Sequence, residues 1–231
     1  MKIVVMIPSR MGSTRFPNKP MAKIYGREMV LWVCDRVAEK YEPIVVTPDM
    51  QIHRLVTLAS YRSVMTGECP TGTDRIAEAS NKVDADMYVN VQGDEPVVNI
   101  EDITEVIQAK LMHPNAVIGS MRRLEYNDEN VVKVMVNAGQ LIDMTRQGTG
   151  RFAQCGIYAF NKWELDQFGN APNSFKQRSL GIHENIEIMR FVDLVVDVRM
   201  VEIQGGPAVD TPGDIKRVME VIKHGRKWKT N

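Results

Sequence analysis

Three cationic side chains, Arg10, Arg15 and Lys19, fall within ten consecutive residues near the start of the sequence. They follow the apolar run 3–7, which predicts a buried β-strand. Ligands of open α/β sheets bind at the carboxyl ends of the strands. The forked donors of arginine and the compact charge of lysine both suit phosphate oxygens. The cluster therefore predicts a phosphate site, with a solvated charged loop as the alternative.

The backbone of the same loop favours close approach of an anion. Gly12 and Ser13 would let N–H groups turn toward a phosphate. Prolines, beginning with Pro8, stiffen the loop and lower the entropy cost of ordering it around a ligand. We therefore expect Pro8, Ser9, Gly12 and Ser13 to form the nucleotide site together with the three cations.

A second polar cluster, Gln92, Gly93, Asp94 and Glu95, follows the expected strand 87–91. Acids at this edge of the sheet, opposite a basic loop, are natural ligands of Mg²⁺. This ion prefers one or two carboxylates together with phosphate oxygens and water. Asp94 is therefore a candidate metal ligand, and a turn or a helix cap is the alternative use of the segment.

Asp210 is a second candidate ligand, far along the chain. Taken alone, Asp210 or Thr211 is more simply explained as the cap of a last helix over 212–224. Together with Asp94, however, Asp210 could complete a metal site. Two carboxylates beside a polyphosphate repel one another unless a divalent ion lies between them. One ion and two ions are both compatible with the pattern.

The balance of charge in these motifs favours nucleotidyl transfer. Arg10, Arg15, Lys19 and one Mg²⁺ would offset most of the charge of a nucleoside triphosphate and leave its α-phosphorus open to a nucleophile. Electrostatic stabilisation of this kind contributes ~3–4 kcal/mol for each well-placed group. We therefore assign catalytic roles to these three cations and to Asp94.

The elements that must position these residues alternate between apolar runs and amphipathic segments, which is typical of βαβ units. We expect an α/β fold with a doubly wound, mainly parallel sheet and a smaller mixed α/β lobe over the carboxyl edge. The predicted strands are 3–7, 44–47, 63–65, 87–91, 117–121, 132–136, 141–144, 153–160 and 194–203. The predicted helices are 28–40, 51–60, 74–83, 100–112, 162–168, 183–191 and 212–224.

Composition excludes several classes of protein. The 231 residues carry a formal net charge of zero, which gives no global field toward nucleic acid or an anionic membrane. No apolar run is long enough to span a bilayer. The three cysteines are widely spaced, as suits a reducing, intracellular compartment. No GxGxxG follows the first strand, and the glycine-spaced segment 67–74 lacks the lysine of a P-loop.

With these motifs in place, the chain resembles the CMP-KDO synthetase family, the 3-deoxy-manno-octulosonate cytidylyltransferases. The resemblance runs nearly end to end, so we expect a single nucleotidyltransferase domain over 1–231. Within it, about 1–130 would be the nucleotide-binding half and about 131–231 the sugar-binding and dimerisation half. The segments that carry the resemblance are 7–20, 71–75, 89–96, 132–134, 156–160 and 209–212.

The resemblance implies a reaction. CTP and a 2-keto-3-deoxy sugar acid, KDO or a close relative, would give the CMP-sugar and pyrophosphate for lipopolysaccharide or capsule synthesis. It also implies Mg²⁺ held by Asp94 and Asp210, and phosphate contacts from Arg10, Arg15 and Lys19. A cytoplasmic location and a homodimer follow by resemblance alone.

The resemblance assigns further binding residues. Thr71, Gly72 and Arg75 match a segment near the cytidine, and Gln92 lies at a position shared by nucleotide and sugar. The positions expected near the sugar acid are Gln92, Gln154, Tyr158, Glu184 and Glu187.

The sequence departs from the family pattern mainly around the expected sugar site. The segment 147–155 is short, Gln154 replaces a histidine, Gly181 replaces an acid, and Ile188 replaces a glutamine. The nucleotide motifs are almost whole. Nucleotidyl transfer is therefore expected, while the acceptor is either KDO or a different ulosonic acid, such as amino-KDO or a nonulosonate. A CTP-binding homologue without catalysis is the remaining alternative.

Overall fold

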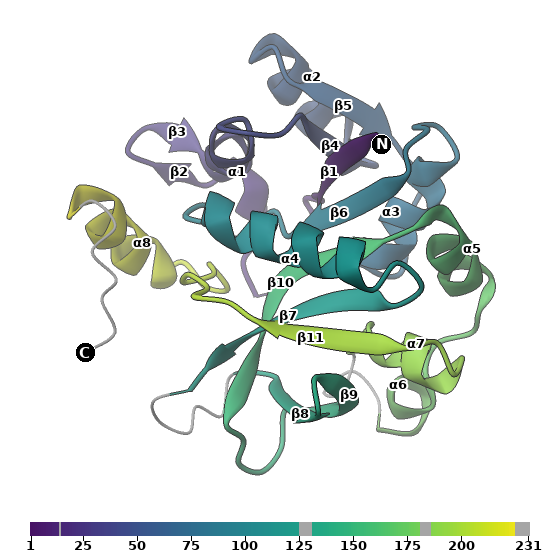
Figure 1. Cartoon of the computed structure of the whole chain (residues 1–231). Helices are drawn as coiled ribbons and strands as arrows, with labels where there is room; N and C mark the ends of the chain where they lie inside the picture. Colours follow the sequence, from purple (N-terminus) through teal and green to yellow (C-terminus); the bar gives the residue numbers. More distant parts are fainter. Residues whose placement is uncertain (14, 125–130, 181–185, 225–231) are drawn as a thin grey trace.

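Parallel strands form the first part of the central sheet (Figure 1). Strand β1 (Ile3–Pro8) lies between β4 (Pro43–Thr47) and β6 (Met87–Val91), and β5 (Arg62–Met65) pairs with β4 on the outside. Both β4 and β6 are buried at every position, as expected for apolar strands covered on two faces. Because the strands are parallel, the carboxyl ends of β1, β4 and β6 lie at one edge of the sheet.

The fold is that of a computed structural model. It describes the chain apart from residue 14, the segments 125–130, 181–185 and 225–231, and the side chains of residues 177, 179 and 180. Within the described part, no helix combines the length and the apolar character needed to cross a bilayer.

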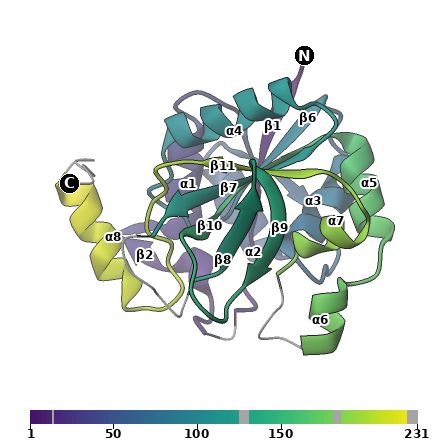
Figure 2. The same cartoon turned by 60° about the horizontal axis from the view of Figure 1, so that its bottom comes forward.

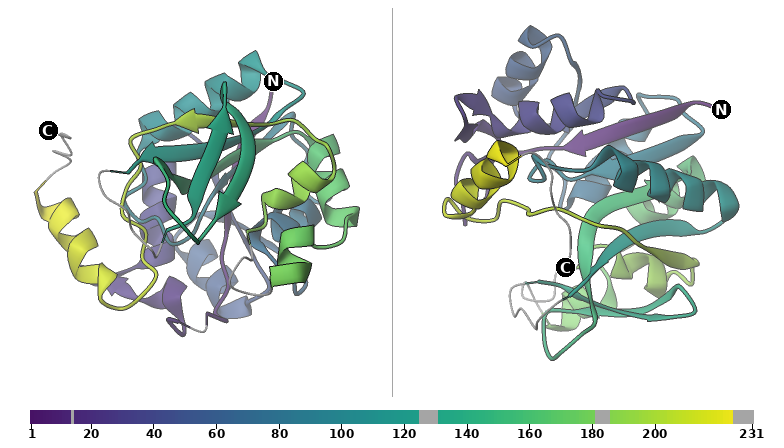
Figure 3. Two further views of the ribbon diagram at one scale, coloured as in Figure 1. Left: turned by 90° about the horizontal axis from the view of Figure 1, so that it is seen from below. Right: turned by 60° about the vertical axis from the view of Figure 1, so that its left-hand side comes forward.

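The second part of the sheet is mixed and folds back on itself. Strand β10 (Phe152–Phe160) is antiparallel to both β6 and β7 (Val117–Arg123), and β11 (Val198–Glu202) runs parallel to β7. In the hairpin of β8 (Lys133–Asn137) and β9 (Gln140–Thr145), β9 pairs with β11 and β8 pairs with β10. Strands β10, β7, β11, β9 and β8 therefore close into a ring, which Figures 2 and 3 show from below.

Helices cover both faces of the sheet, so the expected doubly wound α/β fold class is confirmed. On one face, α1 (Met29–Val37), α2 (Met50–Leu58) and α4 (Ile100–Met112) bury their apolar sides. On the other face lie α3 (Gly72–Ser80) and α5 (Lys162–Asn170). One sheet runs through both parts of the chain. The division into a nucleotide half and a sugar and dimerisation half stays a prediction.

Three phenylalanines fix a further helix, α7 (Met189–Asp193), against the second face. The ring centroids of Phe160 and Phe191 are 5.7 Å apart, and those of Phe168 and Phe191 are 4.9 Å apart. All three side chains are fully buried. Such aromatic pairs contribute ~0.5–1.5 kcal/mol beyond their buried area. The cluster therefore fixes the position of α7 relative to β10 and α5.

The last helix, α8 (Asp214–Lys223), packs away from the main layers, at the left of Figure 1. It lies against the small hairpin of β2 (Lys23–Ile24) and β3 (Arg27–Glu28). A separate apolar cluster joins them, with Ile24, Met29, Val209 and Val218 at its centre. This cluster fixes the chain at Val209, next to the candidate ligand Asp210.

Several elements differ from the sequence expectation. The 3-10 helix Lys19–Met21, the β2–β3 hairpin and α6 (Phe175–Leu180) were not predicted. The helix expected over 183–191 begins at Met189 and ends at Asp193, and its first expected residues lie outside the described chain. The strand expected over 194–203 begins only at Val198, because Val195 has a φ of 58° and stops a continuous strand.

A buried ion pair at the edge between the two helical layers supplies a test of the packing. Lys110 and Glu164 are 2.6 Å apart, with side chains 3% and 0% exposed. Replacing Lys110→Met leaves the Glu164 carboxylate buried without its cation. We expect a loss of about 3–5 kcal/mol in the free energy of unfolding, measured in urea.

The double variant Lys110→Met with Glu164→Gln separates charge from packing. The amide of Gln can still accept the bond that Asn161 N donates to Glu164 Oε2 at 2.8 Å. It should therefore recover most of the lost stability. If Lys110→Met has the same free energy of unfolding as wild type, the ion pair contributes nothing to stability.

Candidate active site

The basic loop starts where β1 ends and is held in place by hydrogen bonds that its backbone N–H groups donate. Ser9 N donates to Val46 O at 3.0 Å, and Met11 N donates to the Asp49 carboxylate at 2.9 Å. Asn18, with a φ of 57°, turns the chain into the 3-10 helix that begins at Lys19. The loop is thus fixed to the carboxyl end of β4, as the position of ligand sites in open sheets requires.

Lys19 joins three distant segments of the chain. Its ammonium lies 2.5 Å from Asp94 Oδ2, 3.0 Å from Val209 O and 3.9 Å from Asp210 Oδ1. The Lys19 side chain is 15% exposed and that of Asp94 is 20% exposed, so water screens the contact only partly. The prediction that the two aspartates converge on the basic loop is confirmed.

The Asp210 carboxylate faces the loop and does not cap the last helix. Arg15 lies 2.8 Å from its Oδ1 atom. Helix α8 begins later than predicted, at Asp214, after Gly213, and has no side-chain cap. The capping role expected for Asp210 or Thr211 is therefore wrong. Instead, the Asp214 carboxylate accepts bonds from the backbone of both residues, which leaves Asp210 to the site.

The two oxygens of the Asp94 carboxylate differ in their partners. Oδ2 receives the Lys19 ammonium, whereas Oδ1 is buried and has no hydrogen-bond partner among the described residues. Asp94 caps no helix, because the N-cap of α4 is Asn99. An orphaned carboxylate oxygen is costly unless a ligand or a cation completes it. The donor set therefore fits a divalent cation between Asp94 and Asp210.

A cation at this place would need ligands from outside the protein. Among the described residues, no group of three or more His, Cys, Asp or Glu side chains has the arrangement of a metal site. Two carboxylates, completed by phosphate oxygens and water, match the coordination that Mg²⁺ prefers in nucleotide enzymes. The arrangement is suited to a metal that arrives with a phosphate ligand.

Comparison with known families decides the class of protein. Residues 4–161 match the family model described as cytidylyltransferase. The chain belongs to the cytidylyltransferase family. It is therefore a nucleotidyltransferase, in agreement with the basic loop and the paired aspartates.

Individual relatives of this cytidylyltransferase match over nearly their whole length. The 3-deoxy-manno-octulosonate cytidylyltransferase of Escherichia coli is 30% identical, with 96% of each chain covered. The protein of the same name from Leptospira interrogans is 33% identical, with 98% of each covered. A solved structure of CMP:2-keto-3-deoxy-manno-octonic acid synthetase complexed with CTP has a TM-score of 0.88 and 28% identity. The match covers 97% of this chain and 99% of that one.

The start of α3 adjoins the basic loop of the cytidylyltransferase. A Cβ atom on Gly72 would lie 3.3 Å from the Pro8 ring, so only glycine fits here without a shift. Thr71 is the N-cap of α3 and forms a capping box with Asp74. Thr71, Gly72 and Pro8, which were predicted to bind the nucleotide, are therefore brought together.

Two arginines of the predicted nucleotide set differ in exposure. Arg10 is exposed at the rim of the loop. Arg75 is 2% exposed, and its guanidinium donates to Thr66 Oγ1 at 2.7 Å and to Gly67 O at 3.1 Å. Burial and the nearby charge of Arg10 lower the pKa of Arg75. Arg75 thus holds the segment after β5 through these two hydrogen bonds. Its contact with a nucleotide stays a prediction.

The residues predicted to bind the sugar lie around β10. The Gln154 amide donates to the Tyr158 hydroxyl, and Tyr158 is fully buried. Gln92 adjoins them, since its backbone N–H donates to Gly156 O at 3.2 Å. Glu187 is half-buried and turns toward α3. Burial and the negative charge of Glu187 raise the pKa of Tyr158, which keeps its hydroxyl protonated. Glu184 lies outside the described residues.

Two further residues of this region were not assigned a role from the sequence. Asp49 holds the basic loop through Met11 N, and its place after strand β4 could have suggested this. Asn90 is fully buried on β6, and neither atom of its amide has a hydrogen-bond partner. The signal for Asn90 was a polar residue inside an otherwise apolar strand.

Glu95 differs from its neighbour Asp94 in charge state. Its carboxyl accepts a hydrogen bond from Gly156 N at 2.8 Å. Desolvation and the charge of Asp94 raise the pKa of Glu95 to about 8. The acid is therefore mostly protonated at neutral pH, so the negative charge of this pair resides on Asp94.

Loss of the Asp94 charge should abolish catalysis while the fold is kept. We expect Asp94→Asn to lower the turnover of cytidylyl transfer by a factor of at least ~10³, since it removes the charge of the candidate metal ligand. Steady-state kinetics and far-UV circular dichroism measure the two properties. Asp86→Asn is a matched control, because Asp86 lies just before the same strand at its opposite end, with a side chain 63% exposed. Near-normal turnover in Asp94→Asn would remove this carboxylate from the mechanism.

Proposed function

We propose that this protein transfers the cytidylyl group of CTP to KDO and releases pyrophosphate, giving CMP-KDO. The observation that carries the proposal is the meeting of Lys19, Asp94 and Asp210 at the carboxyl edge of the sheet. The names of relatives that match over nearly the full length support CTP and KDO as the substrates.

Different charged residues would contact different phosphates of the triphosphate. Arg10 and Arg15 are exposed on the loop and can swing toward the β- and γ-phosphates. Lys19 is held between two carboxylates and can reach only a group that enters beside Asp94. Ser9 Oγ is buried and bonds to no other described residue, so its hydroxyl can donate to a phosphate oxygen that enters beside it. These groups would stabilise the charge that develops on the leaving pyrophosphate.

The chemical step needs no covalent intermediate on the protein. The anomeric hydroxyl oxygen of the acceptor forms a bond to the α-phosphorus and loses its proton to water, and the bond from that phosphorus to the pyrophosphate oxygen breaks in line. The cysteines are unsuited to attack, since burial raises the pKa of the Cys155 thiol well above its usual value. The chain's own residues position the reactants and stabilise the developing charge.

We propose Mg²⁺ as the cofactor, held by Asp94 and Asp210. The orphaned Asp94 Oδ1 atom and the cation already seated between the two carboxylates support this choice. When bound, Mg²⁺ supplies positive charge against the phosphate oxygens. The protein's part is to hold the two carboxylates together beside the basic loop.

The identity of the acceptor depends on residues that differ from the family pattern. The Gln154 amide donates to Tyr158, and its buried Oε1 atom has no hydrogen-bond partner within the described part of the chain, so it can accept a donor from a bound sugar. Ile188 is fully buried in the apolar core and presents no polar group. KDO is the proposed acceptor, and an amino-KDO or a nonulosonate is the alternative with the same chemistry.

The biological setting is also part of the proposal. We propose that the enzyme works in the cytoplasm as a homodimer and supplies CMP-KDO for lipopolysaccharide or capsule synthesis. The support is the near-complete match to relatives named for this reaction.

An acceptor panel tests the proposal directly. Purified protein is incubated with CTP, MgCl₂ and one acid at a time from KDO, amino-KDO and a nonulosonate, and pyrophosphate release is measured. We expect KDO to give the highest kcat/KM. A higher value with another acid would change the assigned acceptor, while CTP binding without release from any acid would indicate a homologue that has lost catalysis.

Lys19 should compete with Mg²⁺ in the nucleotide-free protein, because its ammonium occupies the space between the two carboxylates. We expect Lys19→Met to bind Mg²⁺ about tenfold more tightly than wild type in the absence of CTP, by isothermal titration calorimetry. The same variant should bind CTP more weakly. Lys23→Met is the control, since Lys23 is 65% exposed and faces Glu28. Unchanged Mg²⁺ affinity in Lys19→Met would exclude this competition.

A further inference from the structure

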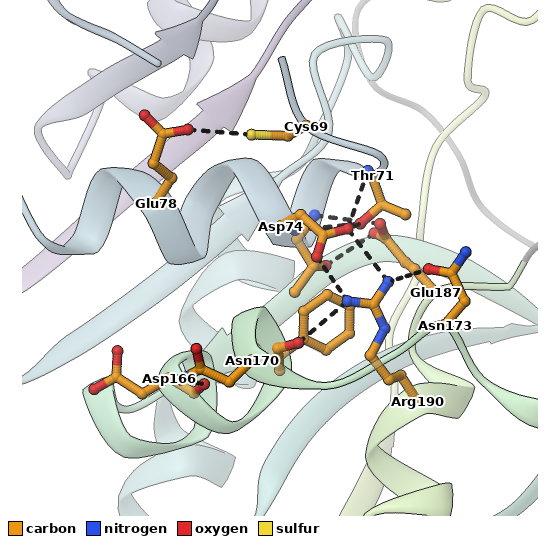
Figure 4. A network of polar contacts seen from close by, with 11 residues as sticks. Cys69, Thr71, Asp74, Glu78, Asp166, Asn170, Asn173, Glu187 and Arg190 are labelled. Carbon is orange, nitrogen blue, oxygen red and sulfur yellow. Dashed lines mark hydrogen bonds and ion pairs between the residues drawn. The ribbon is translucent and has the colours of Figure 1, made fainter. Parts of the chain in front are cut away.

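Arg190 lies at the centre of a buried polar network between α3, α5 and α7 (Figure 4). Its side chain is 2% exposed. The guanidinium forms a forked pair with Asp74, with NH1 2.6 Å from Oδ1 and NH2 3.3 Å from Oδ2. Forked arginine–carboxylate pairs fix orientation as well as charge. Arg190 comes from the part of the chain assigned to the sugar, and Asp74 from the part assigned to the nucleotide.

The guanidinium of Arg190 has further partners besides Asp74. NH1 also donates to Phe168 O at 3.1 Å, and NH2 donates to Asn173 Oδ1 at 3.0 Å. The guanidinium carbon lies 3.9 Å from the centre of the Phe168 ring, in cation–π contact. The group is therefore a fixed point to which Asp74 is attached.

Asp74 has a second task at the beginning of α3. Its Oδ2 atom accepts bonds from Thr71 N at 3.1 Å and Thr71 Oγ1 at 2.7 Å, while Asp74 N donates to Thr71 Oγ1 at 3.2 Å. This capping box satisfies backbone donors that the first turn of the helix leaves unpaired. The orientation of Asp74 thus sets the position of Thr71.

The segment that Asp74 holds adjoins the start of the basic loop at Pro8. Gly72 packs against Pro8, with 3.3 Å between its Cβ position and the proline ring. Glu187 gives a second attachment from the same side as Arg190, because its carboxylate accepts bonds from Thr73 N at 3.2 Å and Thr73 Oγ1 at 2.9 Å. Two residues of the 187–190 segment therefore hold the start of α3 against Pro8.

We infer that Arg190 is a positioning residue for the nucleotide: through Asp74 it keeps the Thr71–Gly72 turn seated against Pro8, where the nucleotide binds. The inference rests on the proposed function and deepens it. The Arg190 side chain is only 2% exposed, and it acts through Asp74. It links the sugar-side segment 187–190 to the nucleotide side of the reaction.

A cavity beside the ion pair would allow the start of α3 to shift once Asp74 is released. Asp74 and Arg190 both line a space of about 450 Å³ between α3 and α5. The other acids there already have partners, since Glu78 pairs with Lys82 at 3.1 Å and Asp166 pairs with Lys162. Without the guanidinium, the Asp74 carboxylate is left partly buried and uncompensated. It would turn into this space toward water and loosen the capping box.

The experiment compares CTP binding by wild type and Arg190→Met, by isothermal titration calorimetry with MgCl₂ and no acceptor. We expect the Kd for CTP to rise about tenfold, because part of the binding energy must re-seat the helix start. In steady state, KM for CTP should rise in parallel, while kcat at saturating CTP changes less than about threefold.

A second buried ion pair supplies the control for simple loss of stability. Lys110→Met removes the cation of a pair that is equally buried but joins α4 to α5. Both variants should unfold at lower urea concentration, and only Arg190→Met should bind CTP more weakly. Arg190→Lys, which keeps the charge without the fork, should give an intermediate Kd. Equal weakening in Lys110→Met, or wild-type affinity in Arg190→Met, would overturn the inference.

Asp74→Asn keeps the experiment decisive if Arg190→Met does not fold. Its amide oxygen can still accept from Thr71, but the charged pair is lost, so a several-fold weaker Kd for CTP is expected. Wild-type affinity would overturn the inference. Failure of the wild type to bind CTP would instead overturn the proposed function and the inference with it.

Discussion

The contact of one ammonium group with two carboxylates organises this molecule. Lys19 can lie between Asp94 and Asp210 only if the end of β1, the end of β6 and the segment after Val209 all meet. Parallel pairing of β1 with β6 brings the first two together. The third is fixed by the bond from Val209 N to Asp94 O at 2.9 Å and by the apolar cluster under α8. Charges held this close favour a site that fills with polyanion and metal together.

Electrostatics at the edge of the sheet separate groups that look alike in sequence. Asp94 and Glu95 are adjacent acids, yet Asp94 faces Lys19 and Glu95 turns to Gly156. Desolvation raises the pKa of Glu95 to about 8, so this acid adds little negative charge beside Asp94. Two arginines differ in the same way: Arg10 is exposed, whereas Arg75 is buried against the segment after β5. The segment after β6 thus carries an acid that pairs with Lys19 and an acid that is mostly protonated.

The segments predicted to bind the nucleotide and the sugar are held by the same neighbouring elements. The residues around β10 adjoin Gln92 on one side, and the segment 187–190 holds the start of α3 on the other. The departures from the family pattern, such as Gln154 and Ile188, lie within these elements. Ile188 packs in the core and so contributes to its rigidity rather than to recognition. A change of acceptor in such a fold therefore remains compatible with an unchanged phosphate site.

The sequence by itself determined the α/β class, most strands, the basic loop and the two aspartates, because apolar periodicity and local clusters of charge are written in neighbouring residues. Only the tertiary structure decided that Asp210 faces Arg15 instead of capping α8, that Arg75 and Tyr158 are buried, and that Arg190 pairs with Asp74. The positive φ of Val195, which delays β11, was equally hidden in an apolar run. These outcomes depend on pairings between residues up to 195 positions apart. Local pattern carries no information about which distant partner, or which degree of burial, a side chain will find.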